Sequence, residues 1–345
     1  MNGHDYSKAK LLIRTPNWLG DVIMSLPALY AISNEFNIQS LDVLTNSKLK
    51  DIFSFVPDIN NIISFDKTSG FTSLFDRFKT AKQVASKKYT HCVIFPNSFD
   101  SAFVPYIAGI PNRIGFNRNL RGFMLSKKIN PPNDFFAQHH SQHYINIAKG
   151  LIEKEIDFEK YLNKKLLMLP EDFKQIILNK FEVVRTNQGK IFAVCPGAEY
   201  GQSKKWSNEN FKEISSRLTK FCGLKVLILG TANDYTSGQI IASGNPDIQN
   251  LCGKTDLKEF IGILSLCNGT ITNDSGAMHL AGALGIKVVS IFGSTNPNAT
   301  KALGNVQFCY SNEKCSPCYE RTCKFGTYAC LKNVGIEEVW SKIEP

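Results

Sequence analysis

The chain has 345 residues, more than one compact core usually holds, so two domains are expected. With 43% hydrophobic and 20% charged residues it is typical of a soluble globular protein, and no apolar run approaches the roughly 20 residues of a membrane span. The net charge of +10 is uneven: 21 basic and 14 acidic residues give +7 in residues 1–165, whereas 19 and 16 give +3 in residues 166–345. This excess suits an acidic partner such as nucleic acid, anionic lipid or a phosphorylated sugar, although a generally basic proteome explains it equally well.

The N-terminus ahead of residue 10 has neither a signal-type apolar region nor a cleavage site. The expected location is therefore the cytoplasm, with contact to a membrane face left open. Six scattered cysteines are expected to be reduced core residues. They are Cys92, Cys195, Cys222, Cys252, Cys267 and Cys309.

In the first half, short apolar runs alternate with longer helical patterns. Strands are predicted at 10–15, 40–44, 62–65 and 91–95, and helices at 22–32, 74–86, 101–110 and 137–152. Pro27 must lie in the first turn of its helix or kink it, because it cannot donate a backbone hydrogen bond. The alternation predicts a parallel sheet with helices on both faces.

Residues 112–128 hold five basic and no acidic residues, with Phe116 and Phe123 between them. The basic residues recur at neither helical nor strand spacing, which predicts a loop with a short strand. Such a loop could receive the phosphates or carboxylates of a substrate. A solvated surface is the simpler interpretation.

The pattern restarts after a connection at 157–170. Strands are predicted at 190–195, 225–229, 248–251, 269–272 and 287–292, and helices at 208–221, at 257–267 and from the turn 273–276 to about 285. The predicted class is α/β, with domains 1–165 and 166–330. The segment 331–345 contains an amphipathic helix at 336–343 that could pack back across the first domain.

The turn Asn273-Asp274-Ser275-Gly276 joins a strand to a helix within a βαβ unit. Its backbone N–H groups and the helix dipole would favour an anion such as phosphate. An ordinary capped helix is the alternative, because Asp and Ser are good N-caps.

Two such domains in tandem would place a cleft between the carboxyl ends of two sheets, where these folds bind ligands. Neither half has Gly-x-Gly-x-x-Gly after its first strand, and Gly-x-x-x-x-Gly-Lys-Ser/Thr is absent from the sequence. Dinucleotide-dependent dehydrogenases and P-loop NTPases are therefore disfavoured. The sequence also lacks Asp-x-Asp, so a diphosphate would be held by Lys204 or Lys205, hydroxyls and helix-end N–H groups.

Five polar or glycine-containing segments fall at or near predicted strand ends. They are Asn17-Trp18-Leu19-Gly20-Asp21; Pro96-Asn97-Ser98-Phe99; Ala108-Gly109-Ile110-Pro111 with Arg113 and Gly115; Pro196-Gly197-Ala198-Glu199-Tyr200-Gly201 with Lys204-Lys205-Trp206; and Thr272-Asn273-Asp274-Ser275-Gly276 with His279. Together, and in this order, they resemble the ADP-heptose:lipopolysaccharide heptosyltransferases, the inverting GT-B enzymes of glycosyltransferase family 9. The form Pro-Gly-Ala-Glu-Tyr-Gly and the Cys-Ser-Pro-Cys at 315–318 are most similar to the members that add the second inner-core heptose.

The resemblance implies a GT-B fold, in which two Rossmann-like domains face a central cleft. It also implies transfer of L-glycero-D-manno-heptose from ADP-heptose to the first heptose of the inner core, with inversion and with neither metal nor other cofactor in the chemistry. Asp21 matches the family's general base, for which helix N-cap is the alternative role. Lys204 matches the lysine that neutralises the leaving diphosphate, and Lys205 is a near rival.

The resemblance places the donor site in the second domain. The N–H groups of Ser275 and Gly276 are expected at phosphate, and Asp274 at heptose hydroxyls. His279 is expected at phosphate or sugar, or else facing the core, and Glu199 is a weaker candidate for the ribose. The expected donor contacts are Glu199, Ser203, Lys205, Asp274, Ser275, Gly276 and His279.

The acceptor implied by the resemblance is heptosyl-Kdo-lipid A of Gram-negative bacteria, which carries carboxylates and phosphates. The candidate contacts are Asn17, Arg113, Arg118, Arg121, Lys127 and Lys128. The same charges would favour peripheral contact with the inner face of the inner membrane. Nucleic acid is not an expected partner.

Two groups of side chains could suggest a metal. His139, His140 and His143 lie close in sequence, but no further ligand is evident near them, so no catalytic metal is expected there. Cysteines 315, 318, 323 and 330 contain one zinc-like pair, but the second spacing is too wide for a standard zinc ribbon. We interpret them as structural, with zinc as the alternative.

Three other functions stay open. The enzyme could add the first or the third heptose, which differs only in the acceptor. In a non-catalytic nucleotide-sugar binding protein, Asp21→Ala should change nothing downstream of binding. A nucleotide-sugar epimerase of similar two-domain shape would turn over without an acceptor.

Overall fold

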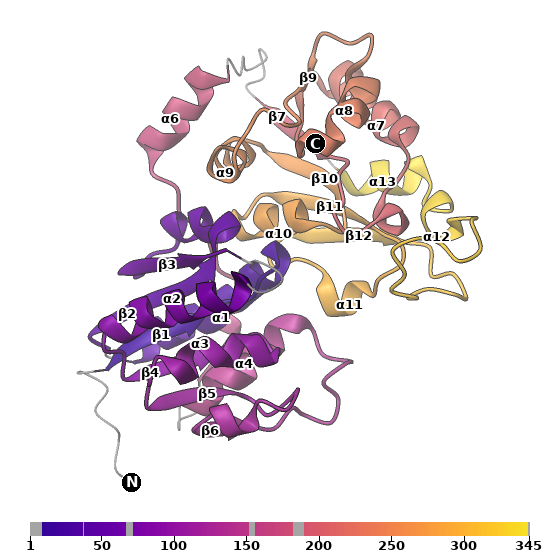
Figure 1. Cartoon of the computed structure of the whole chain (residues 1–345). Helices are drawn as coiled ribbons and strands as arrows, with labels where there is room; N and C mark the ends of the chain where they lie inside the picture. The colour runs from indigo at the N-terminus through magenta and orange to yellow at the C-terminus, as the bar shows by residue number, and fades with distance from the viewer. Residues whose placement is uncertain (1–8, 37, 67–71, 152–155, 182–189, 344–345) are drawn as a thin grey trace. The chain divides into compact units, whose positions relative to one another are not determined.

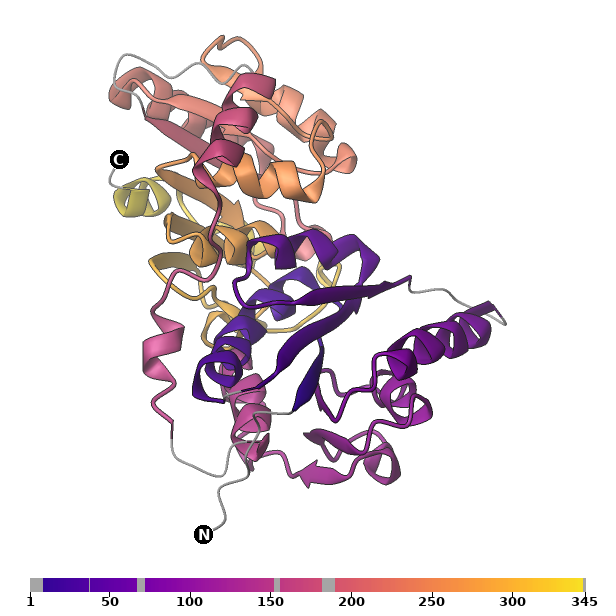
Figure 2. The same ribbon diagram turned by 90° about the vertical axis from the view of Figure 1, so that its left-hand side faces the viewer.

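The computed structural model describes residues 9–36, 38–66, 72–151, 156–181 and 190–343 (Figures 1 and 2). The chain forms two compact units, Met1–Asn163 and Lys164–Pro345. In the described part of the chain, no helix is long and apolar enough to cross a membrane.

The first unit contains a six-stranded parallel sheet with the order β3-β2-β1-β4-β5-β6. Its strands are β1 (Lys10–Arg14), β2 (Ser40–Asn46), β3 (Asn61–Phe65), β4 (His91–Ile94), β5 (Asn112–Phe116) and β6 (Lys127–Ile129). Its helical segments are α1 (Leu19–Glu35), η2 (Ser47–Phe55), α2 (Thr72–Ser86), α3 (Phe99–Ile107), η3 (Gly122–Met124), α4 (His140–Leu151) and α5 (Glu159–Leu162).

Helices cover both faces of this sheet (Figures 1 and 2), with α1 against α4 on one face and α2 against α3 on the other. Strand β1 therefore has apolar residues pointing both ways: Leu11, Leu12 and Ile13 are all buried. Each such side chain contributes about 1.5–3 kcal/mol of burial free energy. Pro27 lies in the interior of α1 rather than in its first turn.

The basic segment 112–128 contains more regular structure than its charge pattern predicts. Strand β5 begins at Asn112, the 3-10 turn η3 follows, and β6 begins at Lys127. The expectation of a loop with one short strand misses β6, because three residues are too few to show a period of two.

The second unit repeats the topology, with the sheet order β12-β11-β10-β7-β8-β9. Its strands are β7 (Ile191–Cys195), β8 (Lys225–Ile228), β9 (Ile248–Asn250), β10 (Gly269–Asn273), β11 (Lys287–Phe292) and β12 (Val306–Tyr310). Its helical segments are α6 (Glu171–Lys180), η4 (Gln202–Lys204), α7 (Asn208–Cys222), η5 (Ala232–Asp234), α8 (Tyr235–Ala242), α9 (Leu257–Ser265), α10 (Gly276–Ala283), α11 (Pro297–Thr300), α12 (Ala329–Lys332) and α13 (Ile336–Ile343).

Helix α13 packs within the second unit. Val339 and Ile343 lie in the same core cluster as Phe211 of α7, and the helix also contacts β11 and β12. Its apolar face is therefore buried against elements of its own unit. The expected packing of this helix across the first domain stays a prediction. The edge strand β12, which was not predicted, supplies part of the surface that α13 covers.

Numbered within each unit, both sheets have the order 3-2-1-4-5-6, which is that of a dinucleotide-binding Rossmann fold. In this order the chain leaves the first and fourth strands in opposite directions. The carboxyl ends of β1 and β4, and those of β7 and β10, are therefore the points at which each unit is built to hold a ligand.

Candidate functional site

Asp21 lies at the switch point of the first unit, seven residues after the end of β1. It is the third residue of α1, whose N-cap is Trp18, so the alternative role of Asp21 as N-cap is wrong. A carboxylate in the first helical turn is favoured by the unpaired N–H groups and the dipole of the helix. Its side chain is 29% exposed, so it is both held by the protein and open to solvent.

Two side chains of α4 approach one oxygen of Asp21. The hydroxyl of Tyr144 donates to Oδ1 at 3.1 Å, and Nδ1 of His140 lies 3.7 Å from the same oxygen. Neither was predicted to lie at the site, because they are more than a hundred residues away in sequence. The only signal was the cluster of histidines, which spacing alone did not connect to Asp21.

Tyr144 is a well-fixed hydrogen-bond donor. Its ring is buried and stands edge-on to Phe95, with ring centroids 5.3 Å apart. Burial, followed by the nearby Asp21 carboxylate, raises the pKa of Tyr144 well above its ordinary value. The hydroxyl therefore stays protonated and holds Oδ1 of Asp21 in place.

His143 has a structural task. Its ring stacks on Phe135 at 3.8 Å, and Nε2 lies 2.7 Å from the carbonyl oxygen of Phe135. Burial lowers the pKa of His143 to about 4, so the ring is neutral near neutral pH. His139 precedes α4 and bonds to Ser141, so it does not share a helix face with His143.

Asn17 and Arg113, two of the six candidate acceptor contacts, already bond to other parts of the protein. The amide oxygen of Asn17 accepts from the guanidinium of Arg14 at 2.9 Å. The Arg113 guanidinium donates to the carbonyl oxygens of Met124 and Ile110 and lies over the Tyr106 ring. Both residues keep part of their surface exposed.

Arg118 and Arg121 differ sharply. The Arg118 guanidinium lies over the rings of Phe135 and Phe136, at 4.5 and 5.3 Å from their centroids, and stays partly exposed. Arg121 is 0% exposed and donates to the carbonyl oxygens of Phe116 and Pro96. Arg121 ties the turn after β4 to the loop after β5 and has no surface to offer a ligand. The predicted direct contact between Arg121 and the acceptor therefore does not fit the burial of this side chain.

In the second unit, Lys204 and Asp274 bring the turns after β7 and β10 together. Their Nζ and Oδ2 atoms are 2.5 Å apart, and the side chains are 12% and 4% exposed. The hydroxyl of Thr295 donates to the same oxygen of Asp274 at 2.5 Å. Removing one partner of such a buried pair costs about 3–5 kcal/mol, because the other charge stays behind.

Asn273, at the end of β10, holds both ends of the segment that carries Lys204. Its amide nitrogen donates to the carbonyl oxygen of Pro196 at 2.7 Å, and its amide oxygen accepts from the backbone N–H of Trp206 at 3.0 Å. The Trp206 indole in turn donates to the carbonyl oxygen of Val334. This fully buried asparagine thus fixes the position of the lysines.

Two glycines make the same segment possible. A side chain at Gly201 would overlap the carbonyl oxygen of Arg321, and its φ of +155° is one that L residues rarely adopt. A side chain at Gly197 would overlap the carboxylate of Asp234. Asp234 also bonds the backbone and hydroxyl of Thr231 and lies 3.4 Å from Nζ of Lys205.

The Ser203 side chain connects segments of the protein and does not face the site where ADP-heptose is expected. It is 2% exposed, its hydroxyl donates to the carbonyl oxygen of Glu320, and the hydroxyl of Ser294 donates to it at 3.0 Å. The prediction of a donor contact through this side chain is therefore not carried forward. Glu199, in contrast, is exposed.

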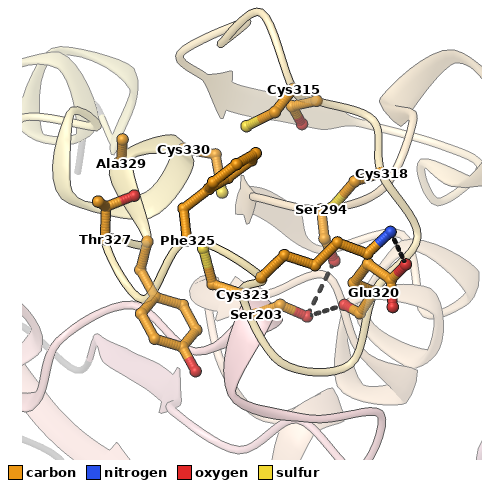
Figure 3. A pocket seen from close by; sticks show the side chains of 13 residues that line it. Ser203, Ser294, Cys315, Cys318, Glu320, Cys323, Phe325, Thr327, Ala329 and Cys330 are labelled. Carbon is orange, nitrogen blue, oxygen red and sulfur yellow. Dashed lines mark hydrogen bonds and ion pairs between the residues drawn. The ribbon is translucent and has the colours of Figure 1, made fainter.

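Beside Ser203 lies a small pocket of ≈ 30 Å³, which admits a water-sized group but not a nucleotide sugar. Figure 3 shows Cys315, Cys318, Cys323 and Cys330 arranged around Phe325 in its lining. All four are free thiols, and backbone hydrogen bonds, foremost from Tyr328, lower the pKa of Cys323. In the described part of the chain, no group of three or more His, Cys, Asp or Glu side chains is arranged to hold a metal ion.

The turn Asp274–Gly276 leads directly into α10. Ser275 is the N-cap residue, in extended conformation, but its side chain makes no capping hydrogen bond to the helix; its hydroxyl lies 3.1 Å from that of Thr272. His279, one turn into α10, is buried. The first N–H groups of the helix therefore lie next to the Lys204–Asp274 pair, and this corner combines two of the features that bind phosphate.

The two Rossmann-like sheets and their polar switch points define a nucleotide-dependent α/β enzyme. The model of the family described as "Glycosyltransferase family 9 (heptosyltransferase)" matches residues 77–329. The chain belongs to this family, and it is therefore a glycosyltransferase.

Curated relatives agree with the family. The chain is 29% identical over 304 residues to "Lipopolysaccharide heptosyltransferase 2" of Escherichia coli strain K12, covering 86% of both chains. It is 27% identical over 342 residues to "Lipooligosaccharide heptosyltransferase 2" of Campylobacter jejuni serotype O:6, covering 97% of this chain and 98% of the relative.

Solved structures extend the likeness to the fold. "Structure of E. coli ADP-heptose lps heptosyltransferase II" aligns with a TM-score of 0.80 at 26% identity and covers 97% of both chains. A family 9 glycosyltransferase from Veillonella parvula aligns with a TM-score of 0.83 at 19% identity, which supports the fold alone. The predicted α/β class, with two Rossmann-like parallel sheets of the GT-B type, is confirmed.

Proposed function

We propose that this glycosyltransferase is a heptosyltransferase II, which moves L-glycero-D-manno-heptose from ADP-heptose to the first heptose of the lipopolysaccharide inner core. The matches to the curated relatives with this name cover 86–98% of the length of those relatives. The E. coli structure of the same name aligns over nearly the whole chain. The observation that carries the proposal is the pair of switch-point sites: a fixed carboxylate after β1 and a lysine beside a helix N-terminus after β7 and β10.

Asp21 is the general base of the proposed reaction. With Oδ1 held by Tyr144, Oδ2 is the oxygen that takes the proton of the acceptor hydroxyl. The acceptor oxygen forms its bond to the anomeric carbon while the bond from that carbon to the ADP oxygen breaks. Attack from the face opposite to the leaving group inverts the configuration.

Lys204 stabilises the departing diphosphate. Negative charge grows on ADP as the glycosidic bond breaks, and a fixed ammonium stabilises that charge more strongly in the transition state than in the ground state. Asp274, which accepts a hydrogen bond from Thr295, holds Lys204 in place before the donor binds. The N–H groups of Ser275 and Gly276, with Lys205 nearby, complete the phosphate contacts. Asp274, at the heptose hydroxyls, is a further contact to ADP-heptose, as are Glu199 and His279.

The acceptor side of the proposal uses Asn17, Arg113 and Arg118, which keep exposed surface in the first unit. Their amide and guanidinium groups suit the phosphates and carboxylates of heptosyl-Kdo-lipid A. Since that acceptor is anchored in a bilayer, the enzyme would work in the cytoplasm at the inner face of the inner membrane. No metal takes part in the proposed chemistry, because Lys204 provides the positive charge that a metal would otherwise supply.

Acceptors that differ by one sugar test this function. Purified protein is mixed with ADP-heptose and Kdo-lipid A analogues that carry no heptose, one heptose or two, and both ADP release and product mass are measured with and without EDTA. We expect heptose addition to the one-heptose acceptor in both conditions. Faster transfer to another acceptor would assign a different step, and ADP-heptose turnover without any acceptor would indicate an epimerase or hydrolase.

A further inference from the structure

Exposed apolar side chains gather on helices α2 and α3 and on the loop at η3. We call them the α2–α3 face, which consists of Phe75, Phe78, Phe99, Tyr106, Ile107 and Phe123. Phe75 is 77% exposed and Phe123 is 63% exposed, so both rings offer most of their surface to solvent.

Ring contacts join several of these side chains. Phe123 meets both Phe99 and Tyr106, with ring centroids 6.0 Å apart in each pair. Phe78 of α2 meets Phe103 of α3 at 6.1 Å, and the two helices lie side by side (Figures 1 and 2). The aromatic groups therefore extend across two helices and a loop.

Basic side chains accompany this surface. Lys79 and Lys82 each follow a phenylalanine of α2 by four residues, so they lie on the same side of the helix. Of the twelve charged residues between positions 72 and 128, ten are Lys or Arg, and of these ten Arg121 is buried. One of the two acidic residues, Asp100, is ion-paired with Arg77 at 2.6 Å.

We propose that the first unit binds an anionic lipid bilayer through the α2–α3 face, with its aromatic rings in the interfacial region and its lysines at the lipid headgroups. A surface that combines exposed aromatic rings with a strong excess of lysine and arginine is complementary to such a membrane. The inference rests on the proposed function in that a lipid-anchored acceptor gives the enzyme a reason to work at a bilayer. It adds to that function by naming the surface and the chemistry of its partner.

The two parts of this surface have separable effects. Each lysine near an anionic membrane strengthens binding roughly fivefold. Reversal of two lysines in Lys79→Glu/Lys82→Glu is therefore expected to weaken binding at least about 25-fold. Loss of two rings in Phe75→Ser/Phe123→Ser removes apolar insertion and is expected to weaken binding about tenfold or more.

The test is co-sedimentation of the full chain with vesicles that contain neither donor nor acceptor. Vesicles of phosphatidylcholine alone are compared with vesicles that also contain phosphatidylglycerol. We expect binding to the mixed vesicles, its loss at high salt, and weakening in both double variants. The matched control is Lys220→Glu/Phe221→Ser at the end of α7, which also changes an exposed lysine and a 67% exposed phenylalanine and is expected to leave binding unchanged.

Two outcomes would overturn the proposal: no binding to phosphatidylglycerol vesicles, or binding that the α2–α3 variants leave as strong as the control does. Vesicle binding is independent of catalysis, so Asp21→Asn should bind like the unchanged chain even if the proposed transfer fails. With a water-soluble, lipid-A-free acceptor, the α2–α3 variants should keep their transfer rate, whereas the rate with a vesicle-borne acceptor should fall. Equal losses of transfer rate with both acceptors would show that the variants damage the enzyme itself and not its binding to the membrane.

Discussion

Tyr144→Phe is a sharp test of the Asp21 site, because it removes one hydroxyl and keeps a buried ring that packs against Phe95. The lost interaction is the 3.1 Å hydrogen bond to Oδ1 of Asp21. A hydrogen bond to a charged group contributes about 1.5–3 kcal/mol. If that bond orients the base in the transition state, kcat should fall about 10- to 150-fold. The KM for ADP-heptose should stay the same, since the proposed donor contacts lie in the other unit.

The assay is continuous ADP release with the one-heptose acceptor, in a cycle with Asp21→Asn. If Tyr144 acts through Asp21, Tyr144→Phe should change the residual rate of the Asp21→Asn enzyme less than about threefold. Tyr161→Phe is the matched control, because the Tyr161 hydroxyl donates to the Glu35 carboxylate at 2.8 Å near the opposite end of α1. This control should lose stability and keep kcat. Equal losses from Tyr144→Phe in both backgrounds would refute a positioning role.

Three further predictions follow from the side-chain contacts. Lys204→Met should lower kcat about 100-fold or more and destabilise the fold. Lys205→Met should have a smaller effect on both kcat and stability, because Asp234 keeps its bonds to Thr231. ADP release and urea unfolding measure these effects, and equal effects of the two variants would contradict the prediction. Because burial lowers the folded-state pKa of His143 to about 4, below the ordinary value of 6.5, its stabilising contribution is present above pH 6.5 and is lost as the pH falls through 4. His143→Gln should therefore lose less stability than the unchanged chain between pH ~7 and ~5, and parallel pH profiles would refute this. Arg121→Lys should lower the free energy of unfolding by about 2–4 kcal/mol, while Arg118→Lys should cost less than about 1 kcal/mol, since only the first is buried with several carbonyl partners.

The alternation of apolar runs and helical patterns was sufficient to predict the fold class and the strands at the centre of both sheets. The central strands are buried on both faces, so their sequences are apolar throughout, as in residues 11–13 and 191–195. Peripheral elements carry weaker signals. β6 has three residues, β12 is only half-buried, and α8 is a helix of eight residues, so none of them shows a clear period.

Local motifs indicated the two candidate sites, but they could not separate contacts to a ligand from contacts within the protein. Arg121 and Ser203 lie in motif segments and still turn their polar groups into the fold. Motifs also failed to indicate the hydrogen-bond partner of Asp21, because Tyr144 is 123 residues away and belongs to no motif. Only the packing of α4 against α1 brings the two side chains together, and that packing depends on the whole unit.

Asp21→Asn tests the central claim most directly, because it replaces the proposed base with a group of the same shape that cannot take a proton. The measurement is single-turnover transfer from ADP-heptose to the one-heptose acceptor, together with the affinity for ADP-heptose. We predict that the rate of transfer falls at least about 100-fold while the affinity for the donor is unchanged. A variant that transfers heptose at the rate of the unchanged enzyme would contradict the assignment of Asp21 as the base.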